Sequence, residues 1–503
     1  MTVVMLLRRF LADYARNPVN LVVLALVPVV FVVVAARSMA DAAELLGGPG
    51  GPAVQTATAG WAAGFLAGIA MYFQTAGSRD ADRRLTLAGL APARLVAARL
   101  LTGLMLAALA ASAGLVALAL PTGVDRPLRV IAGTLMFAGI YLAIGALVGA
   151  TVRNPVNGTV LILFVWILDV FFGPALGPQD RTITRVFPTH FVTLRMIDLP
   201  SRHGGRIGDL GWALVWALGA VAVAWAVVSA TTRGVSRARR AFAPGSAGDQ
   251  IVVGLRMGLR DYRRNAVFWV LLVVVPTVFV LLSVAITPDR STVLTLAEGG
   301  RQVTERFSLP KIHGGTMAPI AVASLAALAG LFVVLDGRSG DRRLALAGFR
   351  TGRLLTVRLC VIGLAVLIAT AVSLDVTATV FNARQWGVYA VGNALVAATY
   401  GLVGVVLGPI FGRVSGVFIA FLMPFLDLGI GQSPMLRSSP PGWAHLLPGY
   451  GGGRVLLDGA LTAHFDEARA LLIGLLWLAG LLVAATLLSR PAVRLAAIQP
   501  SEV

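Results

Sequence analysis

The chain has 503 residues, of which 57% are hydrophobic and 13% are charged, and its mean hydropathy is +0.83. Soluble globular proteins carry about 25% charged residues, so this composition excludes an ordinary soluble domain. Continuous apolar blocks of roughly 20 residues predict an all-α polytopic membrane protein rather than a membrane barrel. The net charge of +19 comes from arginines that flank apolar runs, which indicates membrane topology and not nucleic-acid binding.

Two rare residue types exclude further classes of protein. Lys311 is the single lysine, and the residues before it do not form a GxxxxGK[ST] loop, so the chain is not a standard P-loop ATPase by itself. The single cysteine, Cys360, excludes an intramolecular disulfide and a cysteine metal cluster. The five histidines lack the spacing of a metal-binding motif, so we expect no metal site.

The first predicted element is a helix on the membrane surface, from Thr2 to Asn17. Apolar side chains recur on one face at helical spacing, and charged side chains occupy the other face. The apolar face contains Val3, Leu6, Leu7, Phe10, Leu11 and Tyr14, and the charged face contains Arg8, Arg9, Asp13 and Arg16.

Twelve membrane spans follow, six in each half of the chain. An Arg-rich connector separates the halves, so we expect a first six-helix repeat (1–231), a cytoplasmic linker (232–249) and a second six-helix repeat (250–503). The spans are predicted at residues 19–37, 57–77, 95–120, 128–150, 157–173 and 211–231, then at 267–287, 315–335, 355–380, 387–409, 413–431 and 469–489.

The two halves repeat each other in sequence. Residues 7–32 match residues 255–280 at a shift of 248, and residues 82–100 match residues 341–359 at a shift of 259. Each half has an even number of spans, so the repeats are parallel and related by an axis along the membrane normal. Arginines concentrate in the short loops on one side, which predicts that both termini are cytoplasmic.

The repeated charged loops, at residues 78–94 and 336–353, are candidates for a contact site. Each contains Asp-Arg-Arg and a later arginine. A charged helix of this kind can dock into a partner and pass rigid-body motion to the adjoining spans. Alternatively, the arginines only anchor the spans on the positive side of the membrane. The candidate residues are Asp82, Arg83, Arg84 and Arg94 in the first loop, and Asp341, Arg342, Arg343 and Arg353 in the second.

This layout resembles the ABC-2 type permeases, the membrane subunits of ABC exporters. The resemblance rests on six spans per half, a surface helix with Asp-Tyr-x-Arg-Asn, and the charged loop. In that family the loop commonly begins Glu-Arg, where this chain has Asp-Arg. The resemblance implies that two copies of a separate P-loop ATPase bind the loops and hold ATP and Mg²⁺, so this chain needs no cofactor of its own. The surface-helix residues that would move with the loops are Tyr14, Arg16, Tyr262 and Arg264.

Asp169 and Asp427 are the sharpest polar feature of the predicted spans. Each ends a long apolar run and precedes a Pro/Gly-rich external segment. An acid within a span is costly and usually faces a cavity or a partner, so a substrate or gate contact is one interpretation. A helix-end acid in the headgroup region, or one paired with a nearby arginine, is the other. By the resemblance, the external segments form short re-entrant helices that cap the exit path; ordinary loops are the alternative.

Three functions compete on these observations. The resemblance implies ATP-driven export of apolar or amphipathic molecules, such as drugs, antibiotics or lipids, across a bacterial plasma membrane. A proton-coupled secondary transporter is the alternative, because residues 337–343 (GRSGDRR) match part of a major-facilitator loop motif. A membrane enzyme would need an acidic or His/Asp cluster at the interface, and the sequence has no recognisable one. The surface helix and the external segments favour the exporter.

Overall fold

The structure is a computed structural model that describes residues 2–16, 18–177, 182–198, 205–231, 266–346 and 351–489. The chain divides into two compact units, Met1–Ala238 and Arg239–Val503. The predicted linker (232–249) lies outside the described residues. The predicted second surface helix, with Tyr262 and Arg264, lies outside them as well.

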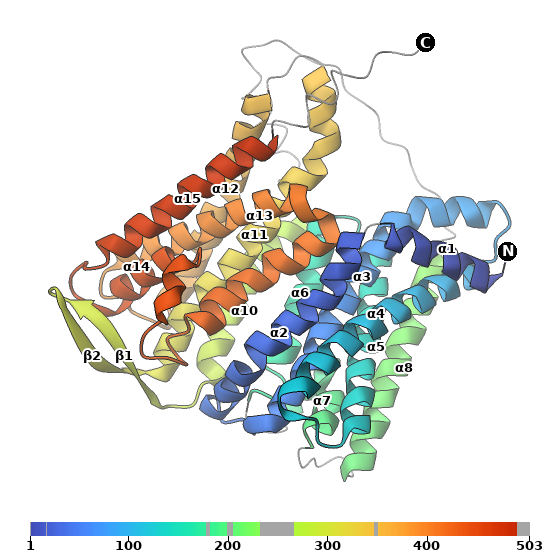
Figure 1. Ribbon diagram of the computed structural model, residues 1–503, viewed down its shortest axis with the longest axis horizontal. Helices are drawn as coiled ribbons and strands as arrows, with labels where there is room; N and C mark the ends of the chain where they lie inside the picture. Colours follow the sequence, from blue (N-terminus) through green and yellow to red (C-terminus); the bar gives the residue numbers. More distant parts are fainter. Residues whose placement is uncertain are drawn as a thin grey trace. The chain divides into compact units, whose positions relative to one another are not determined.

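The first unit is a bundle of long helices (Figure 1). Prolines stand in the first turn of α3, α4, α5 and α6, where the missing N–H costs nothing because it would have no partner within the helix. The elements are α1 (Val3–Ala15), α2 (Pro18–Leu45), α3 (Gly51–Leu87), α4 (Pro92–Thr122), α5 (Pro127–Thr151), α6 (Pro155–Phe171), η1 (Thr182–Val186), α7 (His190–Ile197) and α8 (Gly205–Thr231).

The second unit combines long helices with one β-hairpin (Figure 1). Its helices are α10 (Ala266–Ile286), α11 (Leu309–Leu346), α12 (Thr351–Ala378), α13 (Trp386–Pro424), the π-helical η3 (Phe425–Gly431), η4 (Gly442–Leu446), α14 (Tyr450–Leu461) and α15 (Ala468–Ser489). The strands are β1 (Ser291–Glu298) and β2 (Arg301–Ser308).

The predicted all-α polytopic fold is confirmed. Within the described residues, ten helices are long and apolar enough to cross a membrane. The prediction of twelve spans differs from this number in two places. The span at 157–173 is the shorter helix α6, of 17 residues. The spans at 387–409 and 413–431 form one continuous stretch, α13 followed by η3.

Gly412 divides α13 into two legs that run in opposite directions. Its φ of 70° and ψ of −161° are not helical, and a positive φ favours glycine. Tyr400, on the first leg, donates a hydrogen bond to Asp427, beyond the second leg. A straight helix would separate these residues by about 40 Å at 1.5 Å per residue. The chain therefore reverses at Gly412, and the two legs serve as two spans.

Helices α3 and α11 form the cores of their units. In their most apolar stretches, 89% and 94% of residues are buried, against 17% in α8 and 11% in α15. Close packing on these cores depends on glycine. A Cβ added at Gly145 of α5 would overlap the carbonyl oxygen of Gly68 in α3, and one added at Gly404 of α13 would overlap that of Ala327 in α11.

Gly145→Ala should therefore destabilise the first unit. Forcing a methyl group into a filled contact costs about 1–3 kcal/mol, so we expect a lower midpoint in thermal unfolding of the detergent-solubilised protein. Gly139→Ala is the matched control, because Gly139 lies on the same helix with no atom within 4 Å of its added Cβ. Equal midpoints for the two variants would contradict the contact between α3 and α5.

The β-hairpin was not predicted from the sequence. Glu298 pairs with Arg301 across the turn, and the two residues between them, Gly299 and Gly300, have φ values of 62° and 73°. Positive φ at both central positions is the type I′ geometry that closes two-residue hairpins. The first unit has no room for a counterpart, because residues 46–50 alone connect α2 to α3.

Candidate functional site

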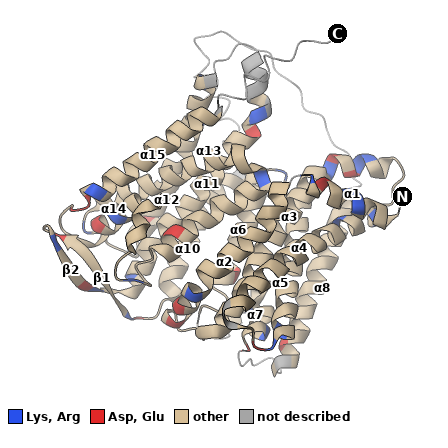
Figure 2. Cartoon of the chain, viewed as in Figure 1, with Lys and Arg blue, Asp and Glu red and all other residues tan. Residues whose placement is uncertain are grey.

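Charged side chains gather mainly at helix ends and in connecting segments, with long uncharged stretches between them (Figure 2). The first Asp-Arg-Arg sequence lies in the last turns of α3, which continues to Leu87. This corrects the predicted loop at residues 78–94, because residues 88–91 alone connect α3 to α4. Gly89, with a φ of 92°, ends the helix. The charged residues are thus held on rigid helices.

Asp82 forms a buried ion pair with Arg99 of α4. The Nη2 of Arg99 lies 2.6 Å from Oδ1, and its Nε donates to Oδ2 at 3.0 Å. The side chains of Arg99 and Asp82 are 13% and 9% exposed. Ser78, one turn earlier, donates to the same carboxylate at 3.0 Å. The Asp82 carboxylate therefore joins α3 to α4, and any part it has in docking a partner is indirect.

Arg99 extends this connection to the surface helix α1. Its guanidinium carbon lies 3.9 Å from the centre of the Phe10 ring, a cation–π contact. Leu6 of α1 is also buried. Asp82, Arg99 and Phe10 thus tie three helices together at one end of the first unit. The sequence offered a signal for Arg99, since Arg358 repeats it at the shift of 259, whereas Gly258 stands in place of Phe10 at the shift of 248.

The remaining predicted residues of the first unit lie near this group. Arg84 and Arg94 are exposed, and Arg83 is half-buried. Arg16 is exposed and forms an ion pair with Asp13 at 2.9 Å. Tyr14 is half-buried, and burial raises the pKa of its hydroxyl to about 12. The exposed arginines therefore present positive charge at the surface, whereas Asp82 is buried.

The second unit is described in less detail at the corresponding end. Asp341, Arg342 and Arg343 belong to the last turns of α11, but their side chains lie outside the described part of the structure. Arg353 is half-buried in the first turn of α12. Asp336 of α11 forms an ion pair with Arg413 at 2.5 Å, which ties the end of α11 to the reversal at Gly412.

Asp169 lies at the end of α6 and is 3% exposed. It accepts hydrogen bonds from the Tyr141 hydroxyl at 2.8 Å, from the Thr189 hydroxyl at 2.6 Å and from the Thr189 N–H at 3.4 Å. Thr189 is the residue that caps the N-terminus of α7. The carboxylate therefore joins three elements, α5, α6 and α7, and its partners are hydroxyls and a backbone N–H rather than an arginine.

Asp427 has the same arrangement in the second unit. It is 4% exposed and accepts hydrogen bonds from the Tyr400 hydroxyl and the Gln432 carboxamide. The N–H of Gly449 donates to its Oδ2 at 2.8 Å, and Gly449 caps the N-terminus of α14. We call each such group a clamp: Tyr141, Asp169 and Thr189 in the first unit, and Tyr400, Asp427, Gln432 and Gly449 in the second.

The clamps hold short helices in both of the Pro/Gly-rich segments that follow Asp169 and Asp427. Helix α7 is buried over almost its whole length, and at its C-terminal end Asp198 lies 2.8 Å from Arg129 of α5. In the second unit, Arg454 of α14 pairs with Glu467, and both side chains are 14% exposed. Each short helix is thus fixed to the long helices at more than one point. Contact of Asp169 and Asp427 with a substrate stays a prediction.

These features define an α-helical polytopic membrane protein whose long helices carry short helices clamped at one end. Residues 59–231 match the family model described as ABC-2 family transporter protein. The match confirms the predicted resemblance to ABC-2 type permeases over this region, which runs from within α3 to the end of α8. It contains the Asp82–Arg99 pair and the first clamp. No curated protein matches the chain.

Proposed function

We propose that this chain supplies both permease modules of an ATP-driven exporter in a bacterial plasma membrane, with both termini in the cytoplasm. Two copies of a separate P-loop ATPase bind the Asp-Arg-Arg ends of α3 and α11 and supply ATP hydrolysis with Mg²⁺. The observation that carries the proposal is the ABC-2 family match over residues 59–231, which spans the α3–α4 hairpin and its exposed arginines, Arg84 and Arg94.

Helix α3 supports a mechanical route from the docking end to the first clamp. A helix of 37 residues is about 55 Å long. Near its other end, the carbonyl oxygen of Trp61 accepts a hydrogen bond from Trp166 of α6 at 2.9 Å, and Gly60 packs against Met196 of α7. A movement of α3 at Asp82 therefore reaches both α6 and α7 through one rigid element, as coupling requires.

The chemistry of the spans favours apolar or amphipathic substrates. Asp169 and Asp427 already accept hydrogen bonds from donors of the protein, which leaves them little capacity to bind a cation. Long uncharged stretches make up most of the described helices (Figure 2). We infer that drugs, antibiotics or lipids fit these surfaces better than ions or sugars.

Co-purification tests the docking proposal. The double variant Arg84→Glu/Arg94→Glu should lose a P-loop ATPase that co-purifies with the unchanged chain from its host, because four units of charge change on an exposed surface. The control is Arg301→Glu/Arg306→Glu, which reverses two exposed arginines on β2. This strand precedes the first residue of α11, whereas the Asp-Arg-Arg sequence lies at the other end of that 38-residue helix. This control should retain the ATPase.

Two results would contradict the proposal. One is an ATPase that stays bound to both variants equally. The other is a chain that purifies alone and drives transport in vesicles from a proton gradient without ATP. The second result would favour the secondary transporter, to which the partial loop motif at residues 337–343 also points.

A further inference from the structure

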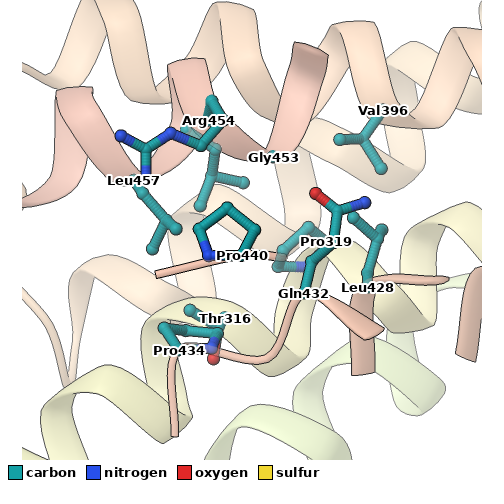
Figure 3. Close-up of a pocket in the computed structure, with 11 residues that line it drawn as sticks. Thr316, Pro319, Val396, Leu428, Gln432, Pro434, Pro440, Gly453, Arg454 and Leu457 are labelled. Carbon is teal, nitrogen blue, oxygen red and sulfur yellow. The ribbon is translucent and has the colours of Figure 1, made fainter. Parts of the chain in front are cut away.

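The second unit contains a pocket beside its clamp. The walls come from α11, α13, η3, α14 and the segment between η3 and η4 (Figure 3). Most of the lining is apolar and includes Pro319, Val396 and Leu428. Thr316, Gln432 and Arg454 contribute polar groups, and the Thr316 hydroxyl already donates to the carbonyl oxygen of Ile312 at 2.8 Å. The pocket lies within one compact unit, so its walls are elements that pack directly on one another.

The first unit has the same local framework, which allows a direct comparison. Tyr141 and Tyr400 are 259 positions apart and each donates to its clamp carboxylate. Gly133 and Gly392 are also 259 apart. A Cβ added at the first would meet Met196 of α7, and one added at the second would meet Leu456 of α14. The two short helices therefore pack on α5 and α13 in the same register.

Within this register, one aromatic ring distinguishes the two units. Phe137 stands four residues before Tyr141 and stacks on it, with ring centres 5.8 Å apart and an angle of 10° between the planes. The same ring packs against Gly60 of α3. The corresponding positions of the second unit are Val396 and Pro319, and both line the pocket. The phenyl ring of Phe137 therefore occupies, in the first unit, the region that corresponds to the pocket of the second unit.

The polar groups of the pocket define what else an occupant needs. The Nε2 of Gln432 donates one of its N–H groups to Asp427, and its carboxamide oxygen is the acceptor that Gln432 can offer an occupant. Arg454 is paired with Glu467, and its Nε donates at 2.9 Å. This pair has no net charge. An uncharged molecule with a hydrogen-bond donor fits this set, whereas a charged one would have to give up its hydration without an opposite charge.

We propose that this pocket binds an uncharged aryl compound that carries a hydroxyl or N–H group. The ring occupies the space beside Val396 and Pro319, and the donor reaches the carboxamide oxygen of Gln432. The proposal does not rest on the transport function. Because Gln432 also donates to Asp427, an occupant contacts the second clamp through one residue. Among the described residues of the first unit, Phe137 occupies the position that corresponds to Val396.

The β-hairpin supports one wall of the pocket. The N–H of Thr295 in β1 donates to the carbonyl oxygen of Ser438 at 2.9 Å, and Ser438 lies between the lining residues Pro434 and Pro440. The hairpin is also joined to the segment after α14, because the N–H of Gly299 donates to Asp466 at 2.7 Å. These contacts fix this wall of the pocket to the hairpin, and the hairpin to the segment after α14.

Photolabelling of the purified chain tests the proposal. The probe is a benzyl alcohol with a trifluoromethyl-diazirine on the ring, and labelled peptides are identified by mass spectrometry. We expect labelling of residues 428–457 that excess benzyl alcohol displaces. Val396→Phe should reduce it to background, because the new ring occupies the site from within. Phe137→Val should create new, displaceable labelling near α7.

Two further variants keep the test decisive if Val396→Phe does not fold. Val396→Ala enlarges the pocket and should increase displaceable labelling. Gln432→Leu should reduce labelling by the benzyl alcohol probe. It should leave labelling by the methyl ether of the probe unchanged, because the ether cannot donate a hydrogen bond. Labelling that benzyl alcohol does not displace, that spreads evenly over the lipid-facing helix α15, or that ignores substitutions at Val396 and Phe137 would overturn the proposal.

Discussion

Arg99→Ala should be the most damaging single substitution at the Asp-Arg-Arg end of the first unit. It leaves the Asp82 carboxylate buried without its cation, and removing one partner of a buried ion pair costs about 3–5 kcal/mol. It also removes the contact with the Phe10 ring, which is worth roughly 0.5–2 kcal/mol. We expect a large fall in the thermal unfolding midpoint, and loss of ATP-dependent transport in vesicles that contain the ATPase.

A double-mutant cycle separates this pair from its surroundings. Asp82→Leu with Arg99→Met replaces both charges by apolar groups and should recover most of the stability, since a well-packed apolar pair often matches a buried ion pair. Phe10→Ala should produce a smaller loss, and Arg94→Ala, at an exposed position, should stay within about 0.5 kcal/mol of the unchanged chain. Additive effects of the two single substitutions would show that Asp82 and Arg99 do not interact.

Asp427→Ala should release the N-terminus of α14. The substitution leaves three donors without their acceptor: the buried Tyr400 hydroxyl and Gly449 N–H, and the part-buried Gln432 carboxamide. Each buried polar group left unpaired costs about 1–3 kcal/mol, so the sum is large for one side chain. We expect faster hydrogen exchange over residues 442–461 and a marked loss of transport. Asp169→Ala should have the corresponding effect on α7.

Conservative variants distinguish a clamp from a substrate contact. Tyr400→Phe removes one donor and leaves the carboxylate in place, so it should raise exchange in α14 less than Asp427→Ala does. Asp375→Ala, at an exposed position of α12, is the control for loss of an acid and should leave exchange unchanged. If Asp427→Ala alters transport but α14 exchanges as in the unchanged chain, the carboxylate acts on the substrate and does not hold the helix.

The positions of the long helices were predictable because apolar length and flanking arginines are local signals. The partners of the charged residues were not, because they depend on tertiary contacts. The sequence alone predicts Asp82 as an exposed loop residue. Its partner Arg99 lies 17 positions later, and only the packing of α4 against α3 brings the two together. In the sequence, Asp169 is a single acid at the end of an apolar run. Its partners Tyr141 and Thr189 come from other elements and meet it only in the folded chain. The hairpin at 291–308 escaped notice because its short strands carry mixed polar and apolar residues.

Helix α6 has a consequence for how the bundle separates two aqueous phases. Its 17 residues extend about 26 Å at 1.5 Å per residue, less than the roughly 30 Å of a hydrocarbon core. Helix α6 alone therefore falls short of a full span. The eight-residue helix α7 is joined to its end through Asp169 and to α5 through Asp198, and it is buried over almost its whole length. A displacement of α7 would expose this buried surface, so α5, α6 and α7 should move together as one packed block.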